Sequence, residues 1–348
     1  MNEIDILEKL VSFNTINDKE NVKIIEYIEN FVNKLGFRTI YKDKILIATN
    51  SKNNLEDVGL AFVGHTDTVG YKDWEYDPFK LTREGDKLIG LGTCDMKGGL
   101  ACILQAISQV DFSKVNKKMM LVFTYDEEIG FSGIKDFLKL NLKMPEIIIV
   151  GEPTYNESFT GSKGLLEYKV EFLGKSAHSS TPFKGKNAII DAVEFITQLK
   201  AFYEDNIKNI EDEDFDIPYT TFNIGTINGG QAINIVPDLC EIKFDFRTIT
   251  GVEQKIDEYV KQLTNKYQGR ITTINRIKAF KCKSKQSKEN KMAPFITEAS
   301  FLEGERIILG PGPMNPHEKN EYVEISSMEK TVKQYIKIIE NKCNDKDF

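Results

Sequence analysis

Three short apolar runs constrain the fold of this 348-residue chain more than any other feature. They span 59–63, 119–125 and 147–150, and each is nearly continuous in apolar residues. Apolar residues at helical spacing separate the runs, at 100–107 and across 130–140. Strands that are buried on both faces and alternate with helices are typical of α/β folds. The pattern therefore predicts an α/β sheet flanked by helices.

Both ends of the chain show the same kinds of apolar pattern as this region. Apolar residues recur at three- and four-residue spacing over 4–11 and 22–35, and Gly36 follows as a helix-ending residue. Near the C-terminus, 307–310 resembles a sheet strand, and the capping-box sequence of 326–329 indicates the start of a helix. We therefore expect one domain to be assembled from the two ends.

The middle of the chain, after Gly161, has a different pattern of apolar and polar residues. Apolar and polar residues alternate at 166–172, which is the period of a strand with one face in water. The elements expected after it are a helix, two strands, a helix and a strand, at 188–203, 221–227, 241–246, 254–267 and 271–277. The order β-α-β-β-α-β is that of a ferredoxin-like unit. We therefore predict an inserted α+β domain at 162–276, within a discontinuous domain formed by 1–161 and 277–348.

Charge and hydropathy argue against two classes of partner. The formal charge is -7, and no basic stripe is available to neutralise phosphates, so we expect no nucleic-acid binding. The lysine-rich segment 281–291 lacks interleaved aromatic residues and is interpreted as a solvated loop or hairpin end. No apolar run approaches the length of a membrane span, and the acidic start of the chain does not resemble a signal peptide. We therefore expect no membrane partner and a cytoplasmic protein.

The five cysteines are scattered and form no Cys-x-x-Cys pair. This spacing predicts neither a disulfide framework nor a thiolate zinc site. We expect reduced thiols with mainly a packing role, and this includes Cys94, which lies beside a candidate metal ligand.

Residues with catalytic or metal-binding chemistry are concentrated in a few short strings. These strings include the only three histidines of the chain, His65, His178 and His317. Acidic residues stand in comparable strings, namely Asp95, Glu127, Glu128 and Glu152. Together these nitrogen and oxygen ligands are sufficient for a hydrolytic site with two metal ions.

His65 follows a buried strand, where the ligands of open α/β sheets usually project. Asp67 lies two residues later, on the same side if the backbone stays extended. A metal-bound imidazole commonly donates its second N–H to a carboxylate, so Asp67 is a natural partner for His65. Taken alone, a hydrogen-bonded histidine at a strand end explains the pair equally well.

The acidic candidates lie at strand ends or before a helix. Asp95 ends a glycine-rich turn, where it is either a bridging metal ligand or a helix N-cap. Glu127 and Glu128 follow a buried run, and adjacent acids are unfavourable there unless a cation neutralises them. Adjacent side chains point in different directions, so one glutamate can bind a metal while the other transfers protons. A solvated acidic loop or turn is the alternative for this pair and for Glu152.

The remaining two histidines lie in different surroundings. His317 follows the rigid glycine- and proline-rich loop 310–316, which suits a metal ligand. His178 lies among serines of the inserted domain, so we expect it to make a mobile polar contact to substrate. An ordinary surface histidine is the alternative for His178.

Six strings follow one another along nearly the whole chain, at 64–69, 92–98, 124–128, 151–154, 177–180 and 310–312. Together they closely resemble the acetylornithine deacetylase and succinyl-diaminopimelate desuccinylase family of co-catalytic zinc hydrolases. The strings at 93–98 and 297–299 are more similar to the deacetylases than to the desuccinylases. The resemblance implies a zinc-exopeptidase-like catalytic domain with a mixed sheet, and an inserted ferredoxin-like domain that serves as lid and dimerisation domain.

The resemblance also implies a ligand set for two zinc ions. His65, Asp95 and Glu152 would bind one ion. Asp95, Glu128 and His317 would bind the other, so that Asp95 bridges the pair. Cobalt or manganese could replace zinc with these ligands. The peptide bond after the bridging aspartate is implied to be cis.

The same resemblance implies catalytic and substrate-binding roles. Glu127 would be the general base, and Asp67 would orient the first histidine. His178 would stabilise the oxyanion, either in its own site or in the site of a dimer partner. Asn234 and Arg247 would contact the carboxylate or the acyl end of the substrate.

The activity implied is hydrolysis of a linear amide, with removal of an acyl group from an N-acyl amino acid. The resemblance favours deacetylation of N-acetylornithine to ornithine and acetate, within arginine biosynthesis. A succinyl-diaminopimelate desuccinylase, a dipeptidase or an aminoacylase of the same family is the alternative activity. A catalytically silent relative that binds a metal or ligand is the non-enzymatic alternative. The expected partners are a small-molecule substrate and a second copy of the chain, paired through the inserted domain.

Overall fold

The computed structural model describes residues 2–53, 55–283 and 291–343, and the chain divides into two compact units. Unit 1 contains both ends of the chain and unit 2 contains the middle. The ranges are Met1–Gly161, Cys282–Ala293 and Thr297–Phe348 for unit 1, and Ser162–Lys281 and Pro294–Ile296 for unit 2. Most of the predicted lysine-rich loop, at 284–290, lies outside the described residues.

Unit 1 is built around a mixed sheet. Its strands are β1 (Arg38–Lys42), β2 (Leu46–Thr49), β3 (Val58–His65), β6 (Lys118–Thr124), β7 (Ile147–Val150), β8 (Phe159–Ser162), β14 (Lys291–Ala293) and β15 (Glu305–Ile308). The order is β1-β2-β6-β3-β7-β15-β8, and β14 pairs with β8. The three apolar runs of the sequence form β3, β6 and β7 at the centre, where neighbouring strands are parallel. The predicted α/β fold with a mixed sheet is confirmed.

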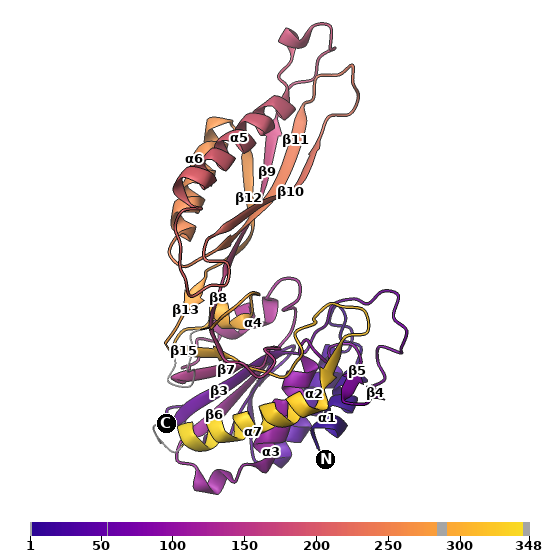
Figure 1. The fold of residues 1–348 in the computed structure, drawn as a ribbon, viewed down its shortest axis with the longest axis vertical. Helices are drawn as coiled ribbons and strands as arrows, with labels where there is room; N and C mark the ends of the chain where they lie inside the picture. The colour runs from indigo at the N-terminus through magenta and orange to yellow at the C-terminus, as the bar shows by residue number, and fades with distance from the viewer. Residues whose placement is uncertain (1, 54, 284–290, 344–348) are drawn as a thin grey trace. The chain divides into compact units, whose positions relative to one another are not determined.

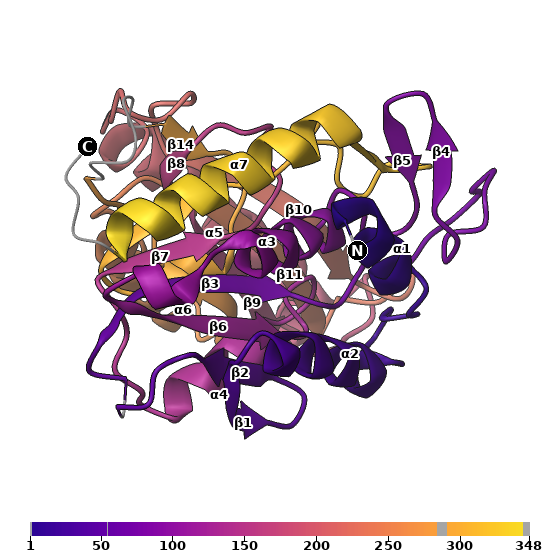
Figure 2. The ribbon, with the colours of Figure 1, turned by 90° about the horizontal axis from the view of Figure 1, so that it is seen from below.

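Helices cover this sheet and form a shared core with it. They are α1 (Glu3–Val11), α2 (Asn21–Lys34), α3 (Lys97–Gln109), α4 (Ser132–Lys139) and α7 (Ile325–Lys342), with short 3-10 turns η1 (Phe112–Lys114) and η3 (Glu298–Phe301). The apolar faces of α1, α2, α3 and α7 join alternate strand residues such as Leu60 and Phe62 in one buried cluster. Figure 2 shows α3 and α7 lying across the strands. Gly36 has φ +86° just after α2, which fits its predicted helix-ending role.

A small sheet precedes the last helix. Its strands are β4 (Thr82–Glu84), β5 (Lys87–Ile89) and β16 (Tyr322–Glu324), in the order β16-β5-β4. The prediction that Ser326 caps the last helix is wrong, because α7 begins at Ile325 directly after β16, with Glu324 as its N-cap residue. The hydroxyl of Ser326 instead donates to Asp86 Oδ2 at 2.6 Å, so it contacts another loop.

Unit 2 has the predicted order β-α-β-β-α-β. Its elements are β9 (Gly164–Leu173), η2 (Pro182–Lys184), α5 (Ala188–Asn206), β10 (Thr221–Gly229), β11 (Leu239–Thr248), α6 (Glu253–Lys266), β12 (Arg270–Ile277) and β13 (Phe280–Lys281). The antiparallel sheet has the order β10-β11-β9-β12, and α5 and α6 lie side by side along it (Figure 1). Alternate residues of β9 and β11 are buried, as the two-residue period predicted. The ferredoxin-like insertion is confirmed.

All five cysteines are free thiols, as predicted, and four of them are buried. Within the described ranges, every helix is too short or too polar to cross a membrane.

The register of the parallel strands brings several loops to one edge of the unit 1 sheet. His65 of β3 is opposite Thr124 of β6, and Val150 of β7 is opposite both Val63 of β3 and Ile308 of β15. The four strands therefore end at the same edge. The loops that leave this edge contain the acidic candidates after β6 and β7 and the candidate histidine after β15.

Candidate metal centre

His65 lies at the centre of the acid-rich edge. It is the last residue of β3 and is completely buried. Its Nε2 atom lies 3.0 Å from Asp95 Oδ1 and 3.6 Å from Glu152 Oε1. The structure therefore brings together three side chains from β3, from the turn before α3 and from the loop after β7.

A second histidine approaches the same aspartate from the other side. His317 Nε2 lies 3.6 Å from Asp95 Oδ2 and 2.9 Å from Glu128 Oε2. Asp95 thus presents one oxygen to His65 and the other to His317, which is the arrangement expected of a bridging ligand. The peptide bond between Asp95 and Met96 is cis, as the resemblance implied.

Asp67 links His65 to the glutamate pair. Its carboxylate lies 3.4 Å from His65 Nδ1, and its main-chain oxygen lies 3.1 Å from the same nitrogen. The backbone N–H groups of Glu127 and Glu128 donate to the two carboxylate oxygens of Asp67, each at 3.2 Å. Asp67 can therefore orient the imidazole and the loop after β6 at once. Burial opposes its ionisation, but contact with His65 lowers its pKa.

Acidic groups outnumber cationic groups at this edge, and their pKa values reflect the imbalance. Burial raises the pKa of Glu152 well above its usual range, and Asp95 adds to the shift. Burial raises the pKa of Glu127 and Glu128 too, and Asp95 again acts in the same direction. A nearby cation would favour the charged form of all three carboxylates.

The acidic groups at this edge raise the pKa values of the two histidines. Burial opposes the charged form of His65, but Glu152, Asp67 and Asp95 raise its pKa well above its usual value. The hydrogen bond to Glu128 raises the pKa of His317 to about 9. The acidic surroundings therefore favour the positively charged form of both imidazoles.

The donor set fits a divalent metal ion. Ligand atoms of His65, Asp95 and Glu128 all lie within 4.8 Å of one another. Glu128 Oε1 is buried and has no hydrogen-bond partner among the described residues, and a buried unpaired oxygen is costly unless something binds it. Imidazole nitrogens with carboxylate oxygens are typical zinc ligands. Cys94 is buried and donates from its Sγ to the oxygen of Pro313 at 3.2 Å, in line with its predicted packing role.

Two further glutamates lie near this centre without a role predicted from the sequence. Glu298 of η3 is buried and accepts a hydrogen bond from Thr124 Oγ1, and burial raises its pKa to about 7. Glu321 is buried too, and burial raises its pKa to about 8. The string at 297–299 was the only sequence signal for Glu298, and it indicated family membership without a role.

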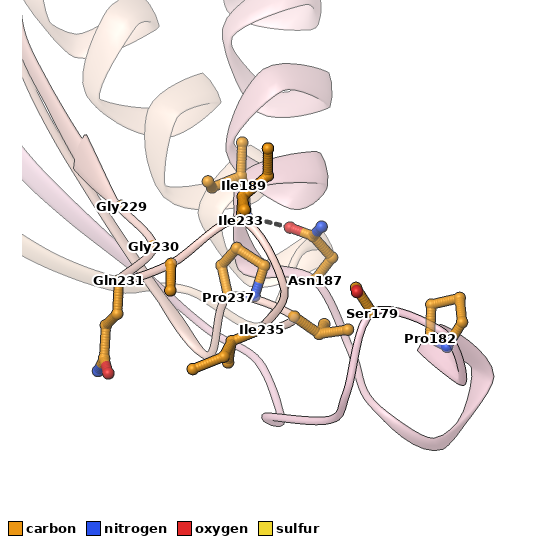
Figure 3. Close-up of a pocket in the computed structure, with 12 residues that line it drawn as sticks. Ser179, Pro182, Asn187, Ile189, Gly229, Gly230, Gln231, Ile233, Ile235 and Pro237 are labelled. Carbon is orange, nitrogen blue, oxygen red and sulfur yellow. Dashed lines mark hydrogen bonds between the residues drawn. The ribbon is translucent and has the colours of Figure 1, made fainter.

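In unit 2, the structure places His178 beside Asn234. The main chain of His178 forms an isolated antiparallel bridge with Ile235, and Ser179 N donates to Asn234 O at 3.0 Å. A pocket of about 540 Å³ lies next to this bridge, between the 179–182 turn, the start of α5 and the loop 229–237 (Figure 3).

Arg247 lies elsewhere in unit 2. It stands near the end of β11 opposite Thr221 and Leu165, whereas the loop of Asn234 precedes the start of β11. Its Nε atom lies 3.4 Å from Asp245 Oδ1, and about half of its side chain is exposed. Within unit 2 of a single chain, Arg247 and Asn234 therefore do not lie together.

Known proteins resemble this chain in both sequence and fold. The model of the peptidase dimerisation domain of the M20 family matches residues 160–270. An acetylornithine deacetylase of Buchnera aphidicola is 33% identical and the match covers 98% of each chain, and one of Yersinia pestis is 31% identical over 94% of this chain and 93% of its own. The chain belongs to the M20 family. An M20 family metallo-carboxypeptidase of Sulfolobus solfataricus shares the fold, with a TM-score of 0.81 at 21% identity over 98% of this chain and 99% of its own.

Membership of the M20 family gives a context for both units. Unit 2 contains nearly all of the part that matches the dimerisation domain, and unit 1 contains the acid-rich edge with its two histidines. M20 proteins include deacetylases and peptidases among the relatives found, so the chain is an amide hydrolase of this family.

Proposed function

We propose that this protein hydrolyses N-acetylornithine to ornithine and acetate with the help of two zinc ions. The observation that supports this most strongly is the position of Asp95, with one oxygen facing His65 and the other facing His317. The named activity of relatives that match the chain over nearly its full length supports the choice of substrate.

The ligands we propose are those that the resemblance implies, and the distances among them support the set. His65, Asp95 and Glu152 would hold one ion, and Asp95, Glu128 and His317 the other. When bound, the metal pair supplies Lewis acidity, which polarises the amide carbonyl and makes a water molecule more acidic. Cobalt or manganese is an alternative to zinc with these ligands.

Glu127 is the proposed acid and base of the reaction. The backbone N–H of Glu127 donates to the carboxylate of Asp67. The carboxylate of Glu127 is buried, so neighbouring charges can shift its pKa toward the value that proton transfer needs. Glu127 would take one proton from water as the oxygen attacks the amide carbon. It would then give this proton to the leaving amine nitrogen when the carbon–nitrogen bond breaks. His178 would donate a hydrogen bond to the carbonyl oxygen as negative charge develops there.

The substitution Glu127→Gln tests this assignment. Because glutamine cannot accept the proton, kcat should fall at least about 10²-fold. Metal content measured by elemental analysis should not change. Glu329→Gln, at an exposed site on α7, is the matched control and should keep the parent kcat. A Glu127→Gln enzyme that retains near-parent turnover with its metals bound would contradict the proposed role.

A substrate panel tests the activity itself. N-acetylornithine, N-succinyl-diaminopimelate and a set of dipeptides are offered to metal-free and zinc-loaded protein. We expect zinc-dependent hydrolysis with the highest kcat/KM for N-acetylornithine. A higher kcat/KM for another member would select the desuccinylase or dipeptidase activity. Bound zinc without any hydrolysis would support a catalytically silent relative.

We further propose that 1–161 with 277–348 is the catalytic domain and that 162–276 is a lid through which two chains pair. The match of 160–270 to a peptidase dimerisation domain supports this division. Sedimentation equilibrium of the full chain should give twice the monomer mass of 39.7 kDa. A monomer at micromolar concentration would contradict the pairing.

A further inference from the structure

The buried side chain of Met96 connects two of the proposed metal ligands. Met96 follows Asp95 directly, is the N-cap residue of α3 and is completely buried. The backbone N–H of His65 donates to Met96 Sδ at 3.3 Å. The imidazole of the same His65 lies 3.0 Å from Asp95 Oδ1. Met96 therefore contacts the end of β3 with its side chain and is bonded to Asp95 through its main chain.

The methyl group of Met96 packs against two glycines that precede metal ligands. A Cβ atom at Gly64 would lie 2.5 Å from Met96 Cε, and a Cβ atom at Gly151 would lie 2.8 Å from it. Glycine allows the main chain to come this close to the methyl group. Gly64 precedes His65, and Gly151 precedes Glu152. The side chain of Met96 thus lies between the segments that present these two ligands.

The thioether of Met96 also replaces a neighbouring strand as the partner of β3. β3 and β7 are paired as far as Val63 and Val150, and Gly151 N extends the ladder by donating to Val63 O at 3.0 Å. In a parallel ladder the next hydrogen bond would run from His65 N to Gly151 O. His65 N donates to Met96 Sδ instead. The position of His65 relative to the loop after β7 therefore depends on this side chain.

We propose that Met96 is a positioning residue for one metal ion, because its thioether sets the spacing of His65, Asp95 and Glu152. This inference rests on the proposed function, in which these three residues hold one of two zinc ions. The sulfur atom accepts the N–H of His65, and the methyl group fills the space against the two glycines. Met96 would thus act on the metal through the ligands and not by contact with it.

Cobalt binding tests the positioning role. Cobalt(II) is added to the metal-free full chain, and its visible absorption reports the geometry of the ligands. Met96→Leu keeps a similar volume but offers no acceptor to His65 N–H, so a buried donor is left unpaired. We expect cobalt affinity to fall roughly 10- to 100-fold, as for partners that orient metal ligands, and the absorption bands to shift. An affinity and a spectrum equal to those of the parent would overturn the proposal.

Met328→Leu is the matched control. Met328 of α7 is completely buried in the same hydrophobic core as Met96. Its main-chain oxygen, which accepts from Cys102 Sγ, is retained in the variant. Met328→Leu should therefore keep the cobalt affinity and the spectrum of the parent. An equal loss in both variants would overturn the proposal, since a general loosening of the core would then explain the effect.

Gly64→Ala disturbs the same contact from the opposite side. The added methyl group would lie 2.5 Å from Met96 Cε and 2.8 Å from Leu100 Cδ2, so the thioether must shift. We expect a fall of several-fold or more in cobalt affinity. Thermal melting of the metal-free proteins checks that each variant is folded. If Met96→Leu does not fold, Gly64→Ala decides, and parent-like affinity and spectrum in folded Gly64→Ala protein would overturn the proposal.

Metal binding and hydrolysis are measured separately, which distinguishes this inference from the proposed function. If the parent protein binds cobalt but hydrolyses no amide, the proposed activity fails, and the cobalt affinities still decide the role of Met96. If the parent protein is active and Met96→Leu binds cobalt as the parent does, only the inference fails.

Discussion

His65 and His317 contact the same aspartate but differ in exposure. The side chain of His65 is completely buried, whereas that of His317 is 52% exposed. His317 also has a φ of 63°, in the left-handed region that non-glycine residues seldom adopt. The half-exposed ring of His317 is accessible to a ligand that arrives from solvent, whereas the ring of His65 is not.

The raised pKa of His317 predicts how metal affinity depends on pH. Its metal-free pKa of about 9 lies above neutrality, so a metal ion must displace a proton before the imidazole can bind. Zinc affinity should therefore rise about tenfold per pH unit for each proton displaced between pH 6 and 8. Calorimetry in buffers of different ionisation enthalpy measures the protons released. Equal affinity at both pH values would contradict this prediction.

The same shift predicts the pH dependence of stability in the metal-free protein. The folded pKa of His317 is raised above its unfolded value, so the stabilisation from its pair with Glu128 is fully present below about 6.5. It is lost as the pH rises through about 9. Denaturant unfolding of metal-free protein between pH 6.5 and 9.5 measures this, with His317→Gln as the variant that should lack this part of the dependence.

At the scale of elements, two loops distant in sequence are joined by Glu321, just before β16. The main-chain oxygen of Glu321 accepts hydrogen bonds from Gly90 N at 3.3 Å and Thr93 Oγ1 at 3.2 Å. Backbone N–H groups of Gly92 and Cys94 donate to the carboxyl group of Glu321, which favours its charged form. The turn that presents Asp95 is therefore braced by the segment that follows His317.

Substitution of Glu321 should weaken metal binding, because the turn that presents Asp95 would lose hydrogen bonds that position it. In Glu321→Ala the turn loses the side-chain acceptor, and zinc affinity should fall by roughly 10- to 100-fold, as for partners that orient metal ligands. Glu321→Gln keeps an acceptor oxygen and should fall much less. Competition with a chromophoric chelator measures both values. Similar affinities in the alanine and parent proteins would show that the main-chain contacts suffice.

At the scale of the whole molecule, metal binding and folding should be coupled in unit 1. The centre buries several carboxylates near one another, and a bound cation compensates their repulsion only in the folded state. Zinc at about 100 times its Kd should add about 2.7 kcal/mol of stability. This corresponds to a rise in Tm of several degrees, on the order of 2–4 °C per kcal/mol. Calorimetric melting with zinc or with EDTA measures the shift, and Asp95→Asn should reduce it.

Local patterns predicted much of the architecture. The central strands β3, β6 and β7 can be recognised in the sequence because burial on both faces requires continuous apolar runs. The strands β9 and β11 can be recognised because burial on one face requires apolar residues at every second position. Short edge strands such as β4 and β16 are too short to show either pattern. The start of α7 was also misplaced, because Ser326 contacts Asp86, about 240 residues away, and no pattern near the serine indicates that contact.

The sequence by itself determined which residues lie at the ends of the buried strands, since strand boundaries follow from local apolar runs. It thereby indicated that His65, Glu127 and Glu152 each follow the end of a buried strand. Only the tertiary structure decided that Asp95 faces two histidines with different oxygens and that Asp67 accepts from two backbone N–H groups. Such contacts depend on distance and direction between groups far apart in the chain, and these quantities exist only once the strands and loops have packed.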